Sequence, residues 1–225
     1  MFDRVISLVG KDNLNLINTK TVLIVGLGGV GGYSMEALIR SGITNLILID
    51  YDKVDITNLN RQIITNRDNI GKLKVDISKE RILSINPDCN VICHNIFLDK
   101  DNIDILDKYK IDYIVDACDS VDTKKLLIDY AIENDIKIIS SMGTANKIDP
   151  SKLEIIDIRK TSYDPLAKKL RKYVIDKKIN KKIMVVSSTE QPIRRDMLAS
   201  LVFVPAVAGI LCANYIIRDI IKSND

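Results

Sequence analysis

The sequence predicts an α/β protein with a Rossmann-like, mostly parallel sheet that carries helices on both faces. Two observations support this prediction. Short apolar runs, typical of buried strands, alternate with longer stretches whose apolar residues recur at helical spacing. A glycine-rich loop, "VGLGGVGG" at 25–32, separates the first such strand from the first helix of the alternation. Repeated strand–helix units of this kind cover a parallel sheet on both sides.

The alternation is regular through the first 150 residues. A strand is expected over 21–26, and a helix over 30–42 that ends at Gly42, since glycine commonly terminates helices. A further helix over 72–85 stops before Pro87, which cannot continue it. The other elements expected here are strands over 45–50, 90–96, 112–118 and 137–141, a short helix near 101–108, and a helix over 123–134.

Beyond residue 150 the pattern changes. A basic amphipathic helix is expected over 163–175, and a C-terminal helix over 205–221 with proline in its first turn. Strands are expected over 152–158, 181–188 and 201–204. No repeat or Pro/Gly/Ser linker divides the chain. We therefore expect one domain over 1–225, made of a core over 1–150 and a basic excursion with C-terminal strands and helix over 151–225.

Residues 198–217 form an uncharged run of 20 residues, which is long enough to span a membrane. Pro205 interrupts this run, so a buried helix without stable membrane insertion is the favoured interpretation. The N-terminus shows no secretory leader, and the four cysteines form no C-x-x-C pair. These features predict a cytoplasmic protein with neither a zinc site nor a disulfide framework.

Charge is unevenly distributed along the chain. Residues 151–195 carry a net charge of +8, whereas the whole chain carries only +3. Two interpretations are open. The segment is either a solvated helix face or a surface that binds a polyanion.

The glycine loop predicts a nucleotide site. Gly26, Gly28 and Gly31 satisfy G-x-G-x-x-G between a strand and a helix, where small residues and a helix N-terminus receive phosphates. Gly29 belongs to the same loop. Asp50, 19 residues beyond Gly31, is placed to hold ribose hydroxyls. Up to this point, NAD and ATP are equally good interpretations.

The polar residues that follow favour ATP. Asp52, Asn58, Arg61 and Gln62 come directly after the second strand, Lys74 stands on the next helix, and Asp119 follows the fourth strand. Arginine and lysine neutralise phosphate charge, and a carboxylate binds Mg²⁺. A hydride-transfer site has little use for such a set, so the sequence predicts ATP and Mg²⁺ as its ligands.

The stretches "GLGGVGG", "IDYDKVDITNLNRQI" and "DACDS", together with Lys74, resemble the adenylation domain of the ThiF/MoeB/HesA group in the ubiquitin-activating-enzyme-like superfamily. The resemblance implies formation of an acyl-adenylate from a carboxylate and ATP. It implies that Asp50 binds ribose and that Asp119 holds Mg²⁺. It also implies a homodimer in which Arg4 reaches into the partner's site. Residues implied to hold the triphosphate are Asn58, Arg61 and Lys74.

The second half, in "SSMGTANKIDPSKLEIIDIRKTSYDPLAKKLRK" and "VVSSTEQPI", resembles the branch of this superfamily that dehydrates threonylcarbamoyladenosine in tRNA. Ala199-Ser200-Leu201 depart from the usual Gly-Ser of that branch. The resemblance implies tRNA as substrate and ring closure without a thiol relay. The residues it implies for tRNA phosphates are Arg159, Lys160, Lys168, Lys169, Arg171 and Lys172.

Two other functions stay open on the sequence, with a nicotinamide dehydrogenase as the last alternative after them. One is adenylation of the C-terminal glycine of a ubiquitin-like sulfur carrier, for which the sequence identifies no sulfur-relay partner. Carrier-activating members commonly have two C-x-x-C pairs, and this chain has none. The other is a non-catalytic ATP-binding module. Intact Arg61, Lys74 and Asp119 argue against that alternative.

Overall fold

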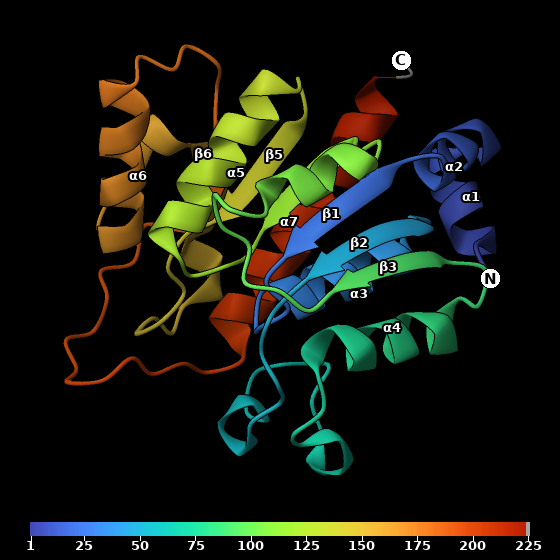
Figure 1. The fold of residues 1–225 in the computed structure, drawn as a ribbon, viewed down its shortest axis with the longest axis horizontal. Coiled ribbons are helices and arrows are strands. Elements are labelled where there is room, and N and C mark those ends of the chain that lie inside the picture. The colour runs from blue at the N-terminus through green and yellow to red at the C-terminus, as the bar shows by residue number, and fades with distance from the viewer. Residues whose placement is uncertain (224–225) are drawn as a thin grey trace.

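The computed structural model describes residues 1–223 and contains a seven-stranded sheet in the order β3-β2-β1-β4-β5-β7-β6 (Figure 1). Neighbouring strands are parallel, except that β6 runs antiparallel to β7. The predicted α/β, Rossmann-like fold class is confirmed, and strands of the second half extend the same sheet. The strands are β1 Thr21–Val25, β2 Asn45–Ile49, β3 Asn90–His94, β4 Tyr113–Asp116, β5 Lys137–Ser141, β6 Leu153–Asp157 and β7 Met184–Ser188.

Helices cover both faces of this sheet, as the alternation predicts (Figure 1). The segment expected as a helix near 101–108 is a 3-10 helix. The α-helices are α1 Asp3–Val9, α2 Lys11–Asn18, α3 Gly31–Arg40, α4 Lys74–Ile85, α5 Val121–Glu133, α6 Pro165–Asp176 and α7 Phe203–Lys222. The 3-10 helices are η1 Ile56–Asn58, η2 Arg67–Asn69, η3 Ile103–Lys108, η4 Pro150–Lys152 and η5 Ile158–Lys160.

Three parts of the fold differ from the sequence prediction. The sequence pattern did not indicate α1 and α2, which precede the first strand. The strand expected over 201–204 is wrong, because α7 begins at Phe203. Pro205 lies in the first turn of α7, where its missing N–H costs no helical hydrogen bond. Of this apolar run only Val204 is buried, whereas Leu201 and Phe203 are 50% and 56% exposed.

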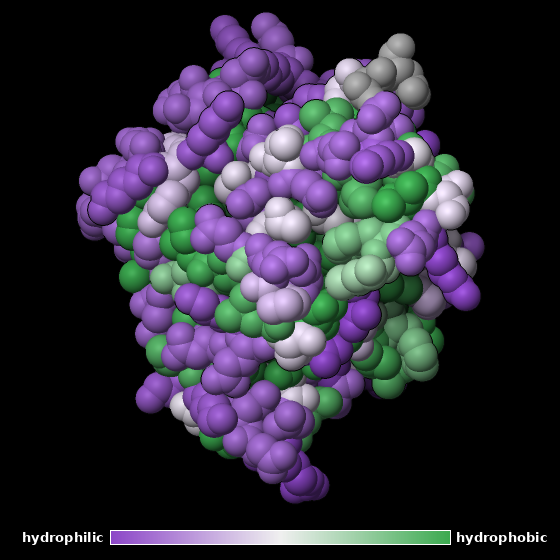
Figure 2. Space-filling model, turned by 90° about the vertical axis from the view of Figure 1, so that its right-hand side faces the viewer, coloured by the Kyte–Doolittle hydropathy of each residue, from purple (hydrophilic) through white to green (hydrophobic). Residues whose placement is uncertain are grey.

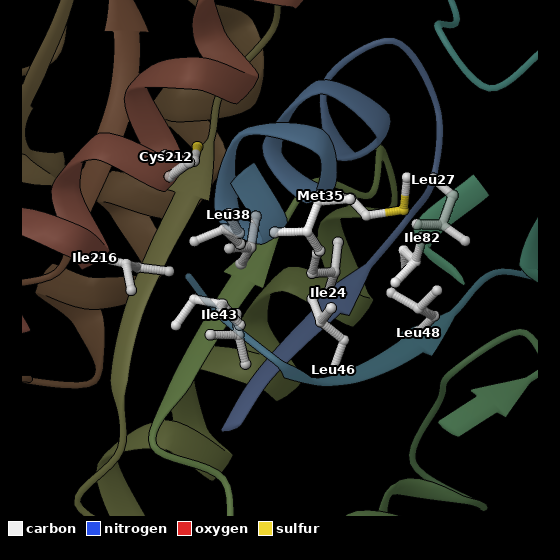
Figure 3. Close-up of a cluster of buried hydrophobic side chains, with 14 of the residues drawn as sticks. Ile24, Leu27, Met35, Leu38, Ile43, Leu46, Leu48, Ile82, Cys212 and Ile216 are labelled. Carbon is white, nitrogen blue, oxygen red and sulfur yellow. The ribbon is translucent and has the colours of Figure 1, made fainter. Parts of the chain in front are cut away.

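Two apolar layers hold the sheet between the helices. Because side chains alternate along a strand, Val22 and Ile24 of β1 face α2, α3, α4 and α7, while Leu23 and Val25 face η3, α5 and α6. Figure 3 shows Ile24 close to Met35 of α3 in the first layer. Burying each such side chain stabilises the fold by about 1.5–3 kcal/mol.

Helix α7 is long and apolar enough to cross a membrane, with 20 residues and a mean hydropathy of 1.5. In the structure it packs along α3, and its Cys212 and Ile216 belong to the buried core (Figure 3). The two helices approach closely at Gly209, where a Cβ atom would lie 2.2 Å from the Val30 carbonyl oxygen. Helix α7 therefore contributes one side to the core, although less than half of its most apolar stretch is buried in the structure.

The strand order reverses at β1, which lies between β2 and β4. Strands β2 and β3 lie on one side of β1, and β4, β5, β7 and β6 follow in that order on its other side. In such sheets a crevice opens beyond the carboxyl ends of the strands at this point, and ligands bind there. The fold thus places the candidate site at the ends of β1, β2 and β4.

Candidate nucleotide-binding site

A cavity of about 300 Å³ opens at the carboxyl ends of β1, β2 and β4. It brings together residues from the glycine loop, the end of β2, η1, the start of α4 and the end of β4. Most residues predicted from the sequence line this cavity. They are Gly26, Gly28, Gly29, Asp50, Asp52, Asn58, Arg61, Gln62, Lys74 and Asp119.

The glycine loop is built for close backbone approach. Gly26 has φ +89°, and a Cβ atom there would lie 2.8 Å from the Ala117 carbonyl oxygen. A Cβ atom on Gly31 would lie 1.8 Å from the Gly26 carbonyl oxygen. Gly31 therefore acts in the packing of the loop and opens α3, although it does not itself line the cavity. The N-terminus of α3 supplies unpaired N–H groups and a positive dipole for phosphate.

Asp50 closes the loop from the end of β2. Its two carboxylate oxygens accept hydrogen bonds from the backbone N–H groups of Leu27, at 2.6 Å, and Asp52, at 2.8 Å. Burial raises the pKa of Asp50, although the positive charge of Lys74 and the two backbone hydrogen bonds oppose the shift. Asp50 thus has a fixed position beside the loop.

Lys74 and Asp52 form an ion pair inside the cavity. The Nζ atom of Lys74 lies 2.7 Å from Oδ2 of Asp52, and the side chains are 5% and 44% exposed, respectively. Residue 74 is the first of α4, which fixes the origin of its side chain. An ammonium group held this way, with a half-exposed partner, is available to a phosphate oxygen.

The segment after β2 forms a turn that carries the amide and guanidinium groups. Asn58 lines the cavity and caps η1 by accepting a hydrogen bond from the Asp55 N–H at 3.1 Å. Arg61 donates to the Thr57 carbonyl at 2.9 Å. Gln62 is buried, and its Oε1 atom has no hydrogen-bond partner within the described chain. This buried acceptor leaves room for a hydrogen bond from a water molecule or a ligand.

Sequence reasoning missed a buried ion pair beneath the site. Lys124 of α5 and Asp116, the last residue of β4, are both 0% exposed, with Nζ and Oδ1 3.0 Å apart. Lys124 also donates to the Ser141 carbonyl at 2.9 Å, and Ser140 donates to Asp116. Burial alone lowers the pKa of Lys124, but the Asp116 carboxylate outweighs it and the pKa is raised. No distinct sequence signal marks Lys124, because the same helical stretch also carries Lys125, Asp129 and Glu133.

This pair fixes the turn that bears Cys118 and Asp119. The Cys118 thiol donates to Oδ1 of Asp116 at 3.1 Å. Burial, followed by the neighbouring Asp116 charge, raises the pKa of Cys118 above its ordinary value. Its thiol therefore stays protonated at neutral pH, which disfavours a nucleophilic role. Asp119 lines the cavity next to it.

The remaining predicted residues lie outside this cavity. Arg4 is exposed on α1 and does not line the cavity of its own chain. Arg159 donates to Asp157 and to the Ile179 and Lys181 carbonyls, and Arg171 donates to Thr161. Those two arginines are thus engaged within the fold. The four lysines of the same set are exposed, namely Lys160, Lys168, Lys169 and Lys172.

Comparisons with known proteins agree with this geometry. The chain matches the ThiF family over residues 2–224. It is 38% identical to the tRNA threonylcarbamoyladenosine dehydratase of Bacillus subtilis, over 95% of this chain and 92% of that one. It is 42% identical to the Escherichia coli protein of the same name, over 73% of this chain and 61% of that one.

Solved structures of relatives show the same fold. The crystal structure of E. coli tRNA N6-threonylcarbamoyladenosine dehydratase, TcdA, in complex with ATP superposes with a TM-score of 0.94 at 35% identity, covering 99% of this chain and 94% of that one. The E. coli MccB structure with ATP matches at a TM-score of 0.66 and 22% identity, which reflects the shared fold. The family match, which extends over nearly the entire sequence, identifies this chain as a member of the ThiF family.

Proposed function

We propose that this protein is a cytoplasmic, ATP-dependent dehydratase of threonylcarbamoyladenosine in tRNA. The observation that carries the proposal is the convergence of Asp50, Arg61, Lys74 and Asp119 in one cavity of a chain similar along its length to proteins of that name. A relative that binds ATP, the E. coli TcdA, supports adenylation as the chemical route.

The reaction proceeds in two steps. First, the carboxylate of the threonylcarbamoyl group attacks the α-phosphorus of ATP, forming an acyl-adenylate and releasing pyrophosphate. A neighbouring atom of the same modification then attacks the activated carbonyl carbon and closes a ring. The carboxyl oxygen leaves with AMP, one proton goes to solvent, and the nucleoside has lost one water. Because the nucleophile is intramolecular, it has a high effective concentration and needs no enzyme thiol.

Different residues of the cavity bind different parts of ATP. Asp50 receives the ribose hydroxyls, and the glycine loop with the N-terminus of α3 receives phosphate oxygens. Asn58, Arg61 and Lys74 hold the triphosphate and stabilise the charge that develops at the phosphorus under attack. Lys74 would exchange its contact with Asp52 for a phosphate oxygen, since Asp52 is exposed enough to be hydrated by solvent.

Asp119 is the residue proposed to hold Mg²⁺. Among the described residues, no cluster of three or more Asp, Glu, His or Cys side chains could bind a metal ion by itself. A lone carboxylate such as that of Asp119 fits Mg²⁺, which is usually bound by one or two carboxylates together with substrate phosphates and water. When bound, the ion supplies positive charge that neutralises the phosphates.

A homodimer is the proposed assembly, with Arg4 acting in the partner's site. Helix α1 has no buried residue, and its Leu8 is 85% exposed. Figure 2, which faces the α1 side of the molecule, shows hydrophobic side chains between the hydrophilic ones. Exposed apolar side chains such as Leu8 on a surface helix are consistent with an interface between two copies.

The test is incubation with threonylcarbamoyl-modified tRNA, ATP and Mg²⁺, followed by mass spectrometry of the nucleosides. We expect the modified nucleoside to lose the mass of one water, with AMP and pyrophosphate formed in equal amounts. An unchanged nucleoside mass under conditions in which ATP binds would contradict the proposal. Pyrophosphate exchange stimulated by a ubiquitin-like sulfur carrier, and not by tRNA, would favour the alternative adenylyltransferase.

A further inference from the structure

A second cavity, of about 490 Å³, opens beside the nucleotide cavity. Its walls come from the turn after β5, the N-terminal end of α6 and the segment between β7 and α7. In Figure 1 that segment, orange to red, crosses the lower left of the molecule. Asp119 and Thr144 line both cavities, so the two lie side by side there. A ligand in the second cavity would therefore lie next to a nucleotide bound in the first.

The walls of the second cavity are largely apolar. Val30, Met142, Leu166 and Leu198 contribute apolar side chains to it. Its volume lies in the range of about 300–1,000 Å³ that is usual for sites of small molecules and cofactors. Enzymes that act on a base extrude it from the nucleic acid into a pocket and hold it between apolar or aromatic side chains.

One polar anchor is built into these walls. Lys147 and Asp164 form an ion pair with side chains only 1% and 2% exposed, and Lys147 Nζ lies 3.2 Å from Asp164 Oδ2. Lys147 also donates to the Gly143 carbonyl at 2.7 Å, and Asp164 caps α6 by accepting from the Ala167 N–H at 2.9 Å. An ammonium group has three N–H donors, and the described chain provides acceptors for two of them. The third is available to an oxygen of a ligand.

A second, exposed positive charge lies at the edge of this cavity. Lys169 of α6 is exposed and lines it, whereas the other exposed lysines proposed for tRNA do not. Lys169 therefore lies at the cavity and is also accessible from solvent. It is suited to a phosphate group that flanks a base inserted into the cavity.

We propose that the second cavity binds the modified adenosine itself, extruded from a single-stranded loop of the tRNA. The base lies between the apolar walls, the Lys147 ammonium donates to an oxygen of the modification or ribose, and Lys169 contacts an adjacent phosphate. The carboxylate then points to the junction at Asp119 and Thr144, beside the α-phosphate of ATP. This inference rests on the proposed function and specifies how that function selects its substrate.

The test compares two substitutions with a matched control. Ala145 lines the second cavity and not the first, so Ala145→Trp fills the nucleoside site and leaves the ATP site intact. We expect the KM for modified tRNA to rise by about tenfold or more, with ATP affinity unchanged. Lys169→Gln should raise this KM several-fold. Lys182→Gln removes an equal charge from an exposed lysine of the same basic segment, before β7 at the opposite end of the sheet, and should not change it.

The outcomes separate this inference from the proposed function. If the unmodified protein fails to convert modified tRNA, the proposed function is wrong, and the inference falls with it. If the protein converts tRNA but Ala145→Trp keeps the normal KM, the cavity does not bind the nucleoside. If Ala145→Trp fails to fold, the two lysine variants provide the test. Equal KM values for modified tRNA in Lys169→Gln and Lys182→Gln would overturn the inference.

Discussion

At the scale of single residues, the nucleotide cavity depends on buried polar groups whose partners come from different elements. Lys74 of α4 meets Asp52 beyond β2, and Asp116 of β4 meets Lys124 of α5. Burial makes each charge costly unless it is paired, which is why these groups have defined positions. The consequence is a site whose charges are set in place before ATP arrives.

Lys74→Ala removes the ammonium group proposed to hold the triphosphate. We expect kcat/KM for the modified tRNA reaction to fall by about 100-fold or more, because a preorganised positive charge at the reacting phosphate is removed. The fold should survive, since the Asp52 partner is 44% exposed and can be hydrated. Lys72→Ala, two residues earlier and exposed, is the matched control and should keep its activity. Equal activity of the two variants would contradict the assigned role.

Gly26→Ala tests the glycine loop against Gly10→Ala. Both glycines have positive φ, +89° and +84°, but a Cβ atom on Gly10 would meet nothing within 4 Å, whereas one on Gly26 would meet Ala117. Gly10→Ala therefore isolates the conformational cost, roughly 1–3 kcal/mol. Gly26→Ala should be more destabilising in chemical denaturation and should also lose ATP affinity. A similar loss of stability in both, with ATP binding intact, would show that the close approach is unimportant.

At the scale of elements, the helices that carry the site are tied to each other by charge. Glu36 of α3 accepts hydrogen bonds from Arg81 of α4, at 2.9 and 3.1 Å, and from Arg40 at 2.7 Å. Helix α3 begins at the glycine loop, and α4 begins at Lys74. The link between the two helices thus holds the glycine loop and Lys74 in fixed positions relative to each other.

Glu36→Gln should weaken this link in a pH-dependent way. Burial alone raises the pKa of Glu36, but the hydrogen bonds and charges of Arg81 and Arg40 outweigh burial and hold it below the ordinary 4.5. A carboxyl group with a lowered pKa stabilises the fold above its unfolded pKa, and that stabilisation is lost as the pH falls through the folded value. We expect a loss of about 1 kcal/mol at pH 7, since the arginines are partly hydrated.

The measurement is urea denaturation at several pH values. The difference in unfolding free energy between the protein and Glu36→Gln should shrink as the pH falls below 4.5. Glu80→Gln, an exposed glutamate of α4, is the control and should change stability little at any pH. A difference that grows towards low pH would contradict the assigned pKa shift.

At the scale of the whole molecule, the six basic residues proposed to bind tRNA phosphates fall into two groups. The arginines at 159 and 171 bond to carbonyl groups of the fold, while the four lysines are exposed. Replacing Lys160, Lys168, Lys169 and Lys172 by Gln should lower the salt dependence of tRNA affinity by about one unit of log–log slope for each phosphate that is no longer neutralised. Arg159→Gln and Arg171→Gln should mainly lower the melting temperature. An unchanged salt slope after removal of all four lysines would place the tRNA elsewhere.

The assembly can be tested by complementation. If Arg4 acts in the partner's site, Arg4→Ala and Lys74→Ala are each inactive as homodimers. A mixed dimer then has one site with an intact Lys74 and an intact Arg4 from the other subunit. Random mixing should therefore restore about a quarter of the normal activity. No recovery after confirmed subunit exchange would place the action of Arg4 in its own subunit or outside catalysis.

Local patterns in the sequence were enough to predict the strand–helix alternation, the glycine loop and the polar residues that the sheet gathers around it. Side-chain periodicity reports burial, and glycine spacing reports close backbone approach, so neither depends on distant residues. The same rules misassigned 201–204, since an apolar run does not distinguish a strand from the start of a helix.

Long-range packing, in contrast, determines which charges are paired and where the second cavity lies. Lys124 meets Asp116 because α5 packs on the end of β4, and Lys147 meets Asp164 because the turn after β5 lies against the start of α6. The segment between β7 and α7 reaches the turn after β5, where the Asn146 N–H donates to the Ala199 carbonyl at 2.7 Å. Such contacts join different elements, across 8, 17 and 53 positions of sequence, respectively, and the packing of those elements sets the shape and charge of the site.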